Sequence, residues 1–346
     1  NTTGANNTAI GRNALFENTT ASNNTAVGKD ALNKNTTGTE NVAMGVNALD
    51  ANTTGGSNTA IGNGSLSANT TADHNTAVGR DVLVANTTGA SNTAMGSQAL
   101  DANTTASNNT AIGKSALGAN TTGAQNTAVG FQALTLNTTA ANNTAHGYAA
   151  LNVNTTGTQN VAVGSLALDG NTTANDNTAV GYASLSGNTT GANNTAVGSL
   201  AGNAITTGIK NTAIGSLAGD AINTGNFNVA VGMQSLSRDT KGNKSVAVGQ
   251  GALETQNFTS SIDALNTAVG HVAGLSVTTG TDNTLIGALS GDAITDGNTN
   301  STLGSYSLST NQRGDRNTAI GHESLLTMNP SGDVDTFNSA LGYQSG

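Results

Sequence analysis

The pentapeptide Asn126-Thr127-Ala128-Val129-Gly130 recurs along the whole of this 346-residue chain, and its last glycine returns at a fixed interval. From Gly11 to Gly249 the interval is 17 residues, and five further copies follow up to Gly342 with steps of 17 or 21. A period of this size is typical of a solenoid in which each repeat forms one coil stacked on the previous one. The sequence therefore predicts an all-β, parallel β-solenoid (a β-roll) of about twenty 17-residue coils over residues 1–346.

Composition narrows the function. Charged residues are 9% of the chain, the net charge is -9, and cysteine is absent. A nucleic-acid partner requires a stripe of Lys and Arg, which this chain lacks, so none is expected. Thiolate metal sites and disulfides require cysteine, so these are not expected either. No apolar run is long enough for a membrane span, so no membrane insertion is expected either. We expect a chain held together by its backbone ladder and by assembly, without a cofactor.

Each coil is numbered here so that the pentapeptide occupies positions 1 to 5. Position 4 is aliphatic or Met in every coil except that of His146, and position 3 is Ala except at Leu285 and Thr302. Because side chains alternate along a strand, positions 2 and 4 are predicted to face inward and position 3 outward. The outward alanines then predict a face for lateral association between copies, and the glycine at position 5 predicts a corner with positive φ. The alanines assigned to this interface include Ala9, Ala26, Ala43, Ala128 and Ala196.

A second strand is predicted at positions 7 to 9, where Leu usually occupies position 9. Four coils have Gly at position 9 and, in the same coil, a large apolar residue at positions 7 and 12. Constant core volume explains this exchange if positions 7, 9 and 12 share one interior. The four glycines are Gly202, Gly219, Gly274 and Gly291, with Leu200, Leu217, Val272 and Leu289 at position 7 and Ile205, Ile222, Val277 and Ile294 at position 12.

Asparagine recurs at positions 1 and 12. Stacked at roughly 4.8 Å, identical Asn side chains can hydrogen-bond from coil to coil. Twelve Asn-Thr-Thr triplets between Asn1 and Asn188 also match the N-glycosylation acceptor. Their periodic recurrence favours corner ladders over glycosylation.

The stretch Lys244-Ser245-Val246-Ala247-Val248-Gly249 resembles the head repeats of trimeric autotransporter adhesins, which form a left-handed parallel β-roll. The fuller pattern, with Ala-Leu and Asn-Thr-Thr-Gly between copies, resembles repeats of phage and virus tail-fibre proteins. This resemblance implies an extracellular homotrimeric fibre on a virion or cell-surface appendage. Such a fibre would reach towards a glycan or protein receptor on a host surface.

No convergent set of acids, bases and nucleophiles indicates an enzyme. His146 departs from the aliphatic pattern, and a lone inward histidine is usually a satisfied core residue. Three copies of His146 around a three-fold axis would instead form a metal site, which we keep as an alternative.

Binding residues are expected at two places. Position 6 carries aromatic side chains suited to sugar faces or protein anchors. Two stretches, 254–264 and 326–336, each contain four extra residues and predict loops on one side of the solenoid, where recognition commonly resides. The candidates are Phe131, Tyr148, Tyr182, His271, His322 and Tyr343 at position 6, and Phe258, Asp263, Asp333 and Asp335 in the loops.

Residues 1–198 form regular coils, whereas residues 199–346 contain the variant cores and both insertions. The irregular part is therefore the preferred contact region. A different function also fits the composition, because Thr rows at positions 13 and 14 could order water as an ice-binding face. Adjacent strand residues point in opposite directions, which is unfavourable for such a face.

Overall fold

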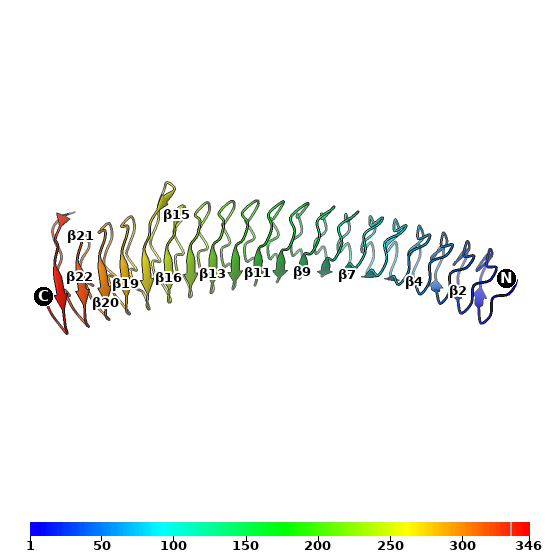
Figure 1. Ribbon diagram of the computed structural model, residues 1–346, viewed down its shortest axis with the longest axis horizontal. Coiled ribbons are helices and arrows are strands. Elements are labelled where there is room, and N and C mark those ends of the chain that lie inside the picture. Colours follow the sequence, from blue (N-terminus) through cyan, green and yellow to red (C-terminus); the bar gives the residue numbers. More distant parts are fainter. Residues whose placement is uncertain (333) are drawn as a thin grey trace. The chain divides into compact units, whose positions relative to one another are not determined.

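The computed structural model describes residues 1–332 and 334–346, and over these residues it contains strands and turns but no helix (Figure 1). Each coil contributes one three-residue strand at positions 2 to 4, and four shorter strands accompany the insertions. The strands are β1 (Thr8–Ile10), β2 (Thr25–Val27), β3 (Val42–Met44), β4 (Thr59–Ile61), β5 (Thr76–Val78), β6 (Thr93–Met95), β7 (Thr110–Ile112), β8 (Thr127–Val129), β9 (Thr144–His146), β10 (Val161–Val163), β11 (Thr178–Val180), β12 (Thr195–Val197), β13 (Thr212–Ile214), β14 (Val229–Val231), β15 (Gly242–Asn243), β16 (Val246–Val248), β17 (Ile262–Asp263), β18 (Thr267–Val269), β19 (Thr284–Ile286), β20 (Ser301–Leu303), β21 (Gly314–Asp315), β22 (Thr318–Ile320), β23 (Val334–Asp335) and β24 (Ser339–Leu341).

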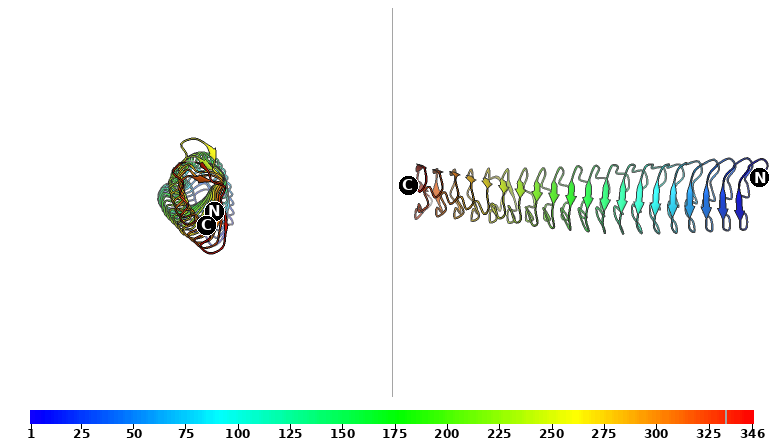
Figure 2. Two further views of the ribbon diagram at one scale, coloured as in Figure 1. Left: turned by 90° about the vertical axis from the view of Figure 1, so that its left-hand side faces the viewer. Right: turned by 90° about the horizontal axis from the view of Figure 1, so that it is seen from below.

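Strands of successive coils pair in parallel and in register, so like residues lie beside like (Figure 2). Ala26 pairs with Ala43, for example, and Ala111 with Ala128. The predicted fold class is confirmed: the chain is a parallel β-solenoid of about twenty coils spaced about 17 residues apart. Two compact units, residues 1–174 and 175–346, are described separately below.

The direction of the strand side chains is opposite to the prediction. Position 3 faces the interior: Ala26, Ala43, Ala128 and Ala196 are all fully buried within their own chain. Ala9 is exposed only because it lies in the first coil. The assignment of these alanines to an interface between copies is therefore wrong. In most coils the thin interior has an alanine methyl group at this point, and the larger aliphatic side chain at position 4 is placed outside.

The predicted second strand at positions 7 to 9 is also absent. The chain turns continuously from position 6 to position 11 in the regular coils, and residues at positions 7 and 9 have positive φ, as at Gln132 (56°) and Leu134 (53°). Leu134 is nevertheless fully buried, as are most leucines at position 9. Burial of a large apolar side chain offsets the cost of a left-handed residue, which is of order 1–2 kcal/mol.

The core exchange is confirmed for positions 9 and 12. A Cβ added to Gly202 would lie 3.0 Å from Ile205 Cδ1, so the side chain at position 12 fills the space that Leu occupies elsewhere. Leu285 replaces Ala at position 3 and fills the equivalent space beside Gly274 and Gly291. Position 7 does not belong to this interior. The residues there are only half-buried, namely Leu200, Leu217, Val272 and Leu289.

Position 12 forms the predicted asparagine ladder. Asn52 Nδ2 donates to Asn35 Oδ1 in the previous coil (2.9 Å) and to the Gly55 carbonyl in its own coil (2.9 Å). The asparagines of eleven Asn-Thr-Thr triplets, from Asn18 to Asn188, are buried. Their side-chain amides are thus inside the folded coil, which supports the ladder interpretation of these triplets.

A second ladder runs along position 1. The backbone N–H of Asn58 donates to Asn41 Oδ1 (2.9 Å), and the same relation recurs in other coils. The corner glycine that follows the strand behaves as predicted. Gly130 has a φ of 138°, and a Cβ there would lie 2.3 Å from the Gly147 carbonyl oxygen of the next coil. Neighbouring corners are therefore too close for any side chain.

Candidate functional site

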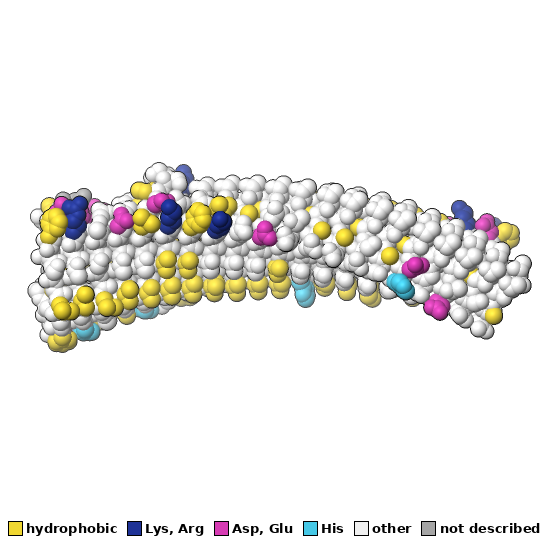
Figure 3. All heavy atoms as spheres, in the orientation of Figure 1, with side chains coloured by type: hydrophobic (Ala, Val, Ile, Leu, Met, Phe, Trp, Pro, Cys, Tyr) yellow, Lys and Arg dark blue, Asp and Glu magenta, His cyan; other side chains and the backbone are white. Residues whose placement is uncertain are grey.

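The outward side chains of position 4 form an exposed row, called here the position-4 stripe (Figure 3). In the first unit their exposed fractions reach 61% at Ile10, whereas Val27, Val78 and Val129 are half-buried. Thr or Val at position 2 lies beside them on the same strand face and is half-buried in most coils. The stripe is aliphatic or Met in both units apart from one residue. Its most exposed members are Ile10, Met44, Ile61, Met95, Ile112 and Val163 in the first unit, and Val197, Ile214, Val269, Ile286, Leu303, Ile320 and Leu341 in the second.

His146 is that exception, and it is exposed at the end of β9 rather than turned into the core. The expectation of an inward histidine is therefore wrong. Its strand neighbours at the same position are Val129 and Val163. A polar imidazole thus interrupts an aliphatic row. Over the described residues, no three side chains of one copy are grouped as metal ligands.

Position 6 presents its aromatic side chains to solvent, as expected. In the first unit the rings of Phe131 and Tyr148 are nearly parallel, with centroids 5.8 Å apart. In the second unit His322 and Tyr343 form a similar pair at 5.6 Å. Tyr306, one coil earlier, extends this group by an edge contact with His322 at 5.9 Å. Sequence reasoning missed Tyr306 because it occupies position 7, one residue after the position-6 column. The remaining two candidates, Tyr182 and His271, are exposed as well.

The two insertions are built alike. Each residue of the second lies 72 positions after its counterpart in the first, and each insertion adds a two-stranded parallel ladder, β15 with β17 and β21 with β23. Lys244 pairs with Asp263 (2.5 Å) in the first, and Arg316 pairs with Asp335 in the second. The hydrogen bond from Lys244 holds the pKa of Asp263 below its usual value. Two predicted loop carboxylates are therefore engaged in surface ion pairs.

An exposed apolar side chain accompanies each ion pair. It is Leu265 in the first insertion and Phe337 in the second, with exposed fractions of 47% and 65%. The Arg316 guanidinium lies over the Phe337 ring at 5.4 Å. Neither apolar residue was singled out from the sequence, although both occupy the position immediately before a pentapeptide.

Phe258 is a correction, because its side chain is 5% exposed and belongs to the core of the first enlarged coil. It covers Gly242, where an added Cβ would lie 2.8 Å from Phe258 Cδ2. Beneath it, the buried Asp239 accepts hydrogen bonds from Gln256 Nε2 (2.6 Å) and from the Gly242 N–H (3.0 Å). The binding role predicted for Phe258 is therefore wrong. The remaining loop candidate, Asp333, lies outside the described residues.

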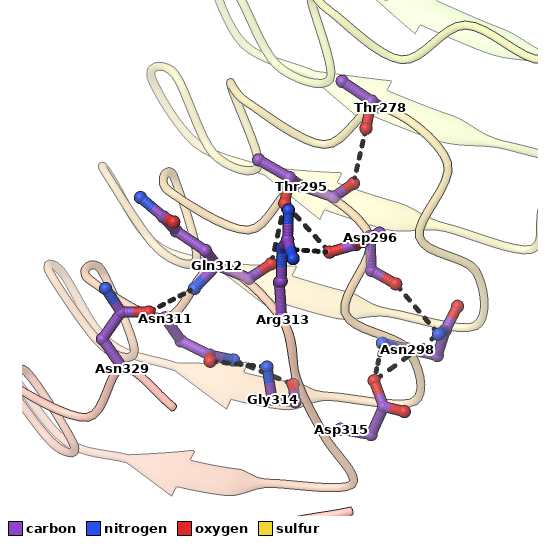
Figure 4. Close-up of polar contacts among 10 residues, drawn as sticks. All are labelled: Thr278, Thr295, Asp296, Asn298, Asn311, Gln312, Arg313, Gly314, Asp315 and Asn329. Carbon is purple, nitrogen blue, oxygen red and sulfur yellow. Dashed lines mark hydrogen bonds and ion pairs between the residues drawn. The ribbon is translucent and has the colours of Figure 1, made fainter. Parts of the chain in front are cut away.

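Polar contacts also fix the corner before the second insertion (Figure 4). The Asn298 N–H donates to Asp315 Oδ1 (2.6 Å), and Arg313 Nε lies 3.8 Å from Asp296 Oδ1. Thr295 Oγ1 donates to the Gln312 carbonyl of the next coil (3.0 Å). These charged residues connect neighbouring coils and do not converge on a common point.

Aspartates at position 10 have an unusual environment. In each of four aspartates the carboxylate oxygen Oδ1 is buried without a hydrogen-bond partner among the described residues, namely in Asp50, Asp169, Asp220 and Asp292. Burial raises the pKa of each of these carboxyl groups above its usual value. The four are separated by three or more coils, so they form no cluster.

The residues that the structure describes enclose no pocket. They form no helix, and therefore none that is long and apolar enough to cross a membrane. Comparison of the chain with known family models and with curated proteins finds no match. Fold and surface together define a β-solenoid repeat protein with an exposed aliphatic strand face.

Proposed function

We propose that this protein is a non-enzymatic structural fibre of an extracellular appendage, on a virion or a cell surface. In this proposal three copies associate along the solenoid, and the fibre serves adhesion or recognition of a host surface. The observation that carries it is the position-4 stripe, which leaves an aliphatic row exposed in both units. Monomeric soluble proteins rarely expose a contiguous apolar surface of that extent.

A second copy of the chain is the partner that suits the stripe best. Its side chains repeat at the strand spacing of roughly 4.8 Å, so a partner that covers a whole unit must repeat at the same spacing. Another copy of this solenoid does so in every coil. With a face about 10 Å wide, each coil offers about 50 Å², and the ten coils of one unit about 500 Å². Two such units offer about 1,000 Å², which exceeds the roughly 800 Å² per partner of a stable interface.

Recognition is assigned to the exposed groups outside the stripe. The paired rings at position 6 offer flat apolar surfaces for a glycan or protein receptor. The two insertions add an ion pair and an apolar side chain each. The regular coils otherwise present Asn, Thr and Ser, which offer few distinctive anchors.

The ice-binding alternative receives no support from the threonine rows. At position 13 the hydroxyl is already used, since Thr36 Oγ1 donates to the Thr53 carbonyl of the next coil (3.0 Å). Thr37 at position 14 is exposed, which leaves one outward threonine per coil at this corner. A face with two free threonine columns is therefore not formed at this corner.

Native mass measurement of the full chain tests the proposal. We expect trimers, and we expect Met95→Asp combined with Ile112→Asp to yield folded monomers, because charges would enter an apolar interface. The matched control is Thr105→Asp with Thr122→Asp, which changes exposed position-14 residues in adjacent coils. A folded, monomeric wild-type chain would overturn the assembly. Release of reducing sugar from a host polysaccharide, or thermal hysteresis, would overturn the assigned role.

A further inference from the structure

We propose that His146 is a metal ligand, and that the three copies of His146 in the assembled fibre bind one divalent transition metal ion such as Zn²⁺. This inference rests on the proposed self-association through the position-4 stripe. It assigns a ligand and a purpose to the one residue that breaks the aliphatic pattern.

The environment of His146 is what requires an explanation. The residue before it in the row is Val129 and the residue after it is Val163, each in register with His146 on a neighbouring strand. The histidine is exposed in the single chain, and among the described residues its side chain has no hydrogen-bond or ion-pair partner. If the stripe is covered by other copies, the imidazole enters an apolar interface. A polar group buried there without a partner costs about 1–3 kcal/mol.

In a three-fold symmetric trimer, the partners of each His146 would be the His146 side chains of the other two copies. In a parallel three-fold arrangement each residue meets its own counterparts at the same height, so three imidazoles converge where the neighbouring levels bring valines together. Three neutral imidazole nitrogens with a fourth position open are a donor set that Zn²⁺ accepts. Metal binding would use one ring nitrogen of each of the three imidazoles at once, and the positive charge of the ion would be held by these three ligands.

The same strand also offers a supporting group. Thr144 lies two residues before His146 on the outward face of β9 and is half-buried. Metal-bound histidines usually donate their second N–H to an oxygen, which fixes the ring orientation. A hydroxyl on the same face suits that role, whereas Val161 occupies the corresponding position on β10.

The experiment uses the full chain, stripped of metal with a chelator and titrated with Co²⁺ and with Zn²⁺. We expect one ion per three chains, with visible Co²⁺ absorption bands that Zn²⁺ displaces. His146→Val, which restores the aliphatic row, should abolish binding while the trimer persists. The control His74→Asn removes an exposed histidine outside the stripe and should bind the ion like the wild type.

The outcomes separate the two proposals. Trimers that bind neither ion, or that still bind after His146→Val, overturn the metal site and leave the fibre proposal intact. Wild-type monomers overturn the assembly and the metal site together. Binding of one ion to each single chain overturns the metal site, because a single imidazole cannot account for it.

Discussion

Asparagine at position 12 connects each coil to its neighbours through its side chain. Asn120 Nδ2 donates to Asn103 Oδ1 and to the Gly123 carbonyl, both at 2.9 Å, and Asn120 Oδ1 accepts from Asn137. We expect Asn120→Ala to lower the free energy of unfolding by about 1–3 kcal/mol, because buried partners lose their hydrogen bonds. Chemical denaturation measures this loss. Thr122→Ala, at an exposed position, is the control and should change stability little.

The aspartates at position 10 make stability depend on pH in a defined direction. Burial raises the pKa of Asp220 in the folded state above its ordinary value of 3.8. Folding therefore favours the protonated form of Asp220. The contribution of this protonated carboxyl group to stability is fully present below pH 3.8 and is lost as the pH rises through the folded-state pKa. We expect Asp220→Asn to raise the melting temperature at pH 7, with a difference that shrinks towards pH 3.8.

Asp263 provides the control of opposite sign. The hydrogen bond from Lys244 lowers the pKa of Asp263. The contribution of the ionised carboxylate to stability is therefore present above pH 3.8 and is lost as the pH falls through the folded-state pKa. Asp263→Asn should lower the melting temperature slightly at pH 7, since exposed ion pairs contribute little. Equal effects of both substitutions across the pH range would contradict the burial argument. Asn already occupies position 10 at Asn33, Asn152 and Asn203.

At the scale of the coil, the corner glycine sets the closest approach between neighbours. Gly130→Ala should cost at least about 1–3 kcal/mol, because φ is 138° and the new methyl group would meet a backbone carbonyl at 2.3 Å. Gly332→Ala is the control, since an added Cβ there has no atom within 4 Å. Denaturation midpoints compare the two variants. Similar stabilities would mean that adjacent coils separate easily.

The two insertions differ in how far they belong to the core. Phe258→Ala should destabilise the protein by about 3–5 kcal/mol, as for other large-to-small core changes, since Phe258 is 5% exposed. The matched variant Phe337→Ala removes a side chain that is 65% exposed and should have a small effect on unfolding. Reversed magnitudes would contradict this assignment. We therefore expect that shortening the first loop would damage the core, because Phe258 belongs to it.

The sequence predicted the coil but not which way its strand faces. Alternation shows that positions 2 and 4 share a face, yet it leaves open which face is inside. The prediction placed positions 2 and 4 inside because position 4 is the more hydrophobic. The constant size of the residue at position 3 was the better indicator of the buried face. Position 3 is nearly always Ala and is buried, while position 4 accepts Val, Ile, Met, Leu and His and is outside. The turn at positions 6 to 11 could not be predicted, because left-handed leucines such as Leu134 contradict local preference.

For the candidate site, the 17-residue repeat predicted where the residues lie better than it predicted their roles. It placed Phe131, Tyr148, His322 and Tyr343 on one exposed column, and the structure brings them together in pairs. It could not distinguish the buried Phe258 from the exposed Phe337, because the insertions break the period that had indicated direction. The buried network of Asp239 and Gln256 depends on contacts between coils, which no local pattern encodes.

At the scale of the whole molecule, a solenoid should tolerate the removal of complete coils. Its stability is approximately a sum of coil and nearest-neighbour contributions, so no distant contact is lost when the period is kept. Deletion of residues 63–96 removes 34 residues and joins Gly62 directly to Ser97, which restores position 5 followed by position 6. We expect a folded protein whose first unit is shorter by about 10 Å, measured by small-angle scattering.

Deletion of residues 63–88 is the control for that experiment. It removes fewer residues but joins Gly62 to Gly89, at position 15, so both asparagine ladders lose register at the junction. The shorter deletion should therefore be the more damaging one, with loss of cooperative unfolding in the first unit, because buried Asn side chains there would lack partners. If the 34-residue deletion proved equally damaging, stability would depend on contacts beyond adjacent coils, and the ladder account of this fold would fail.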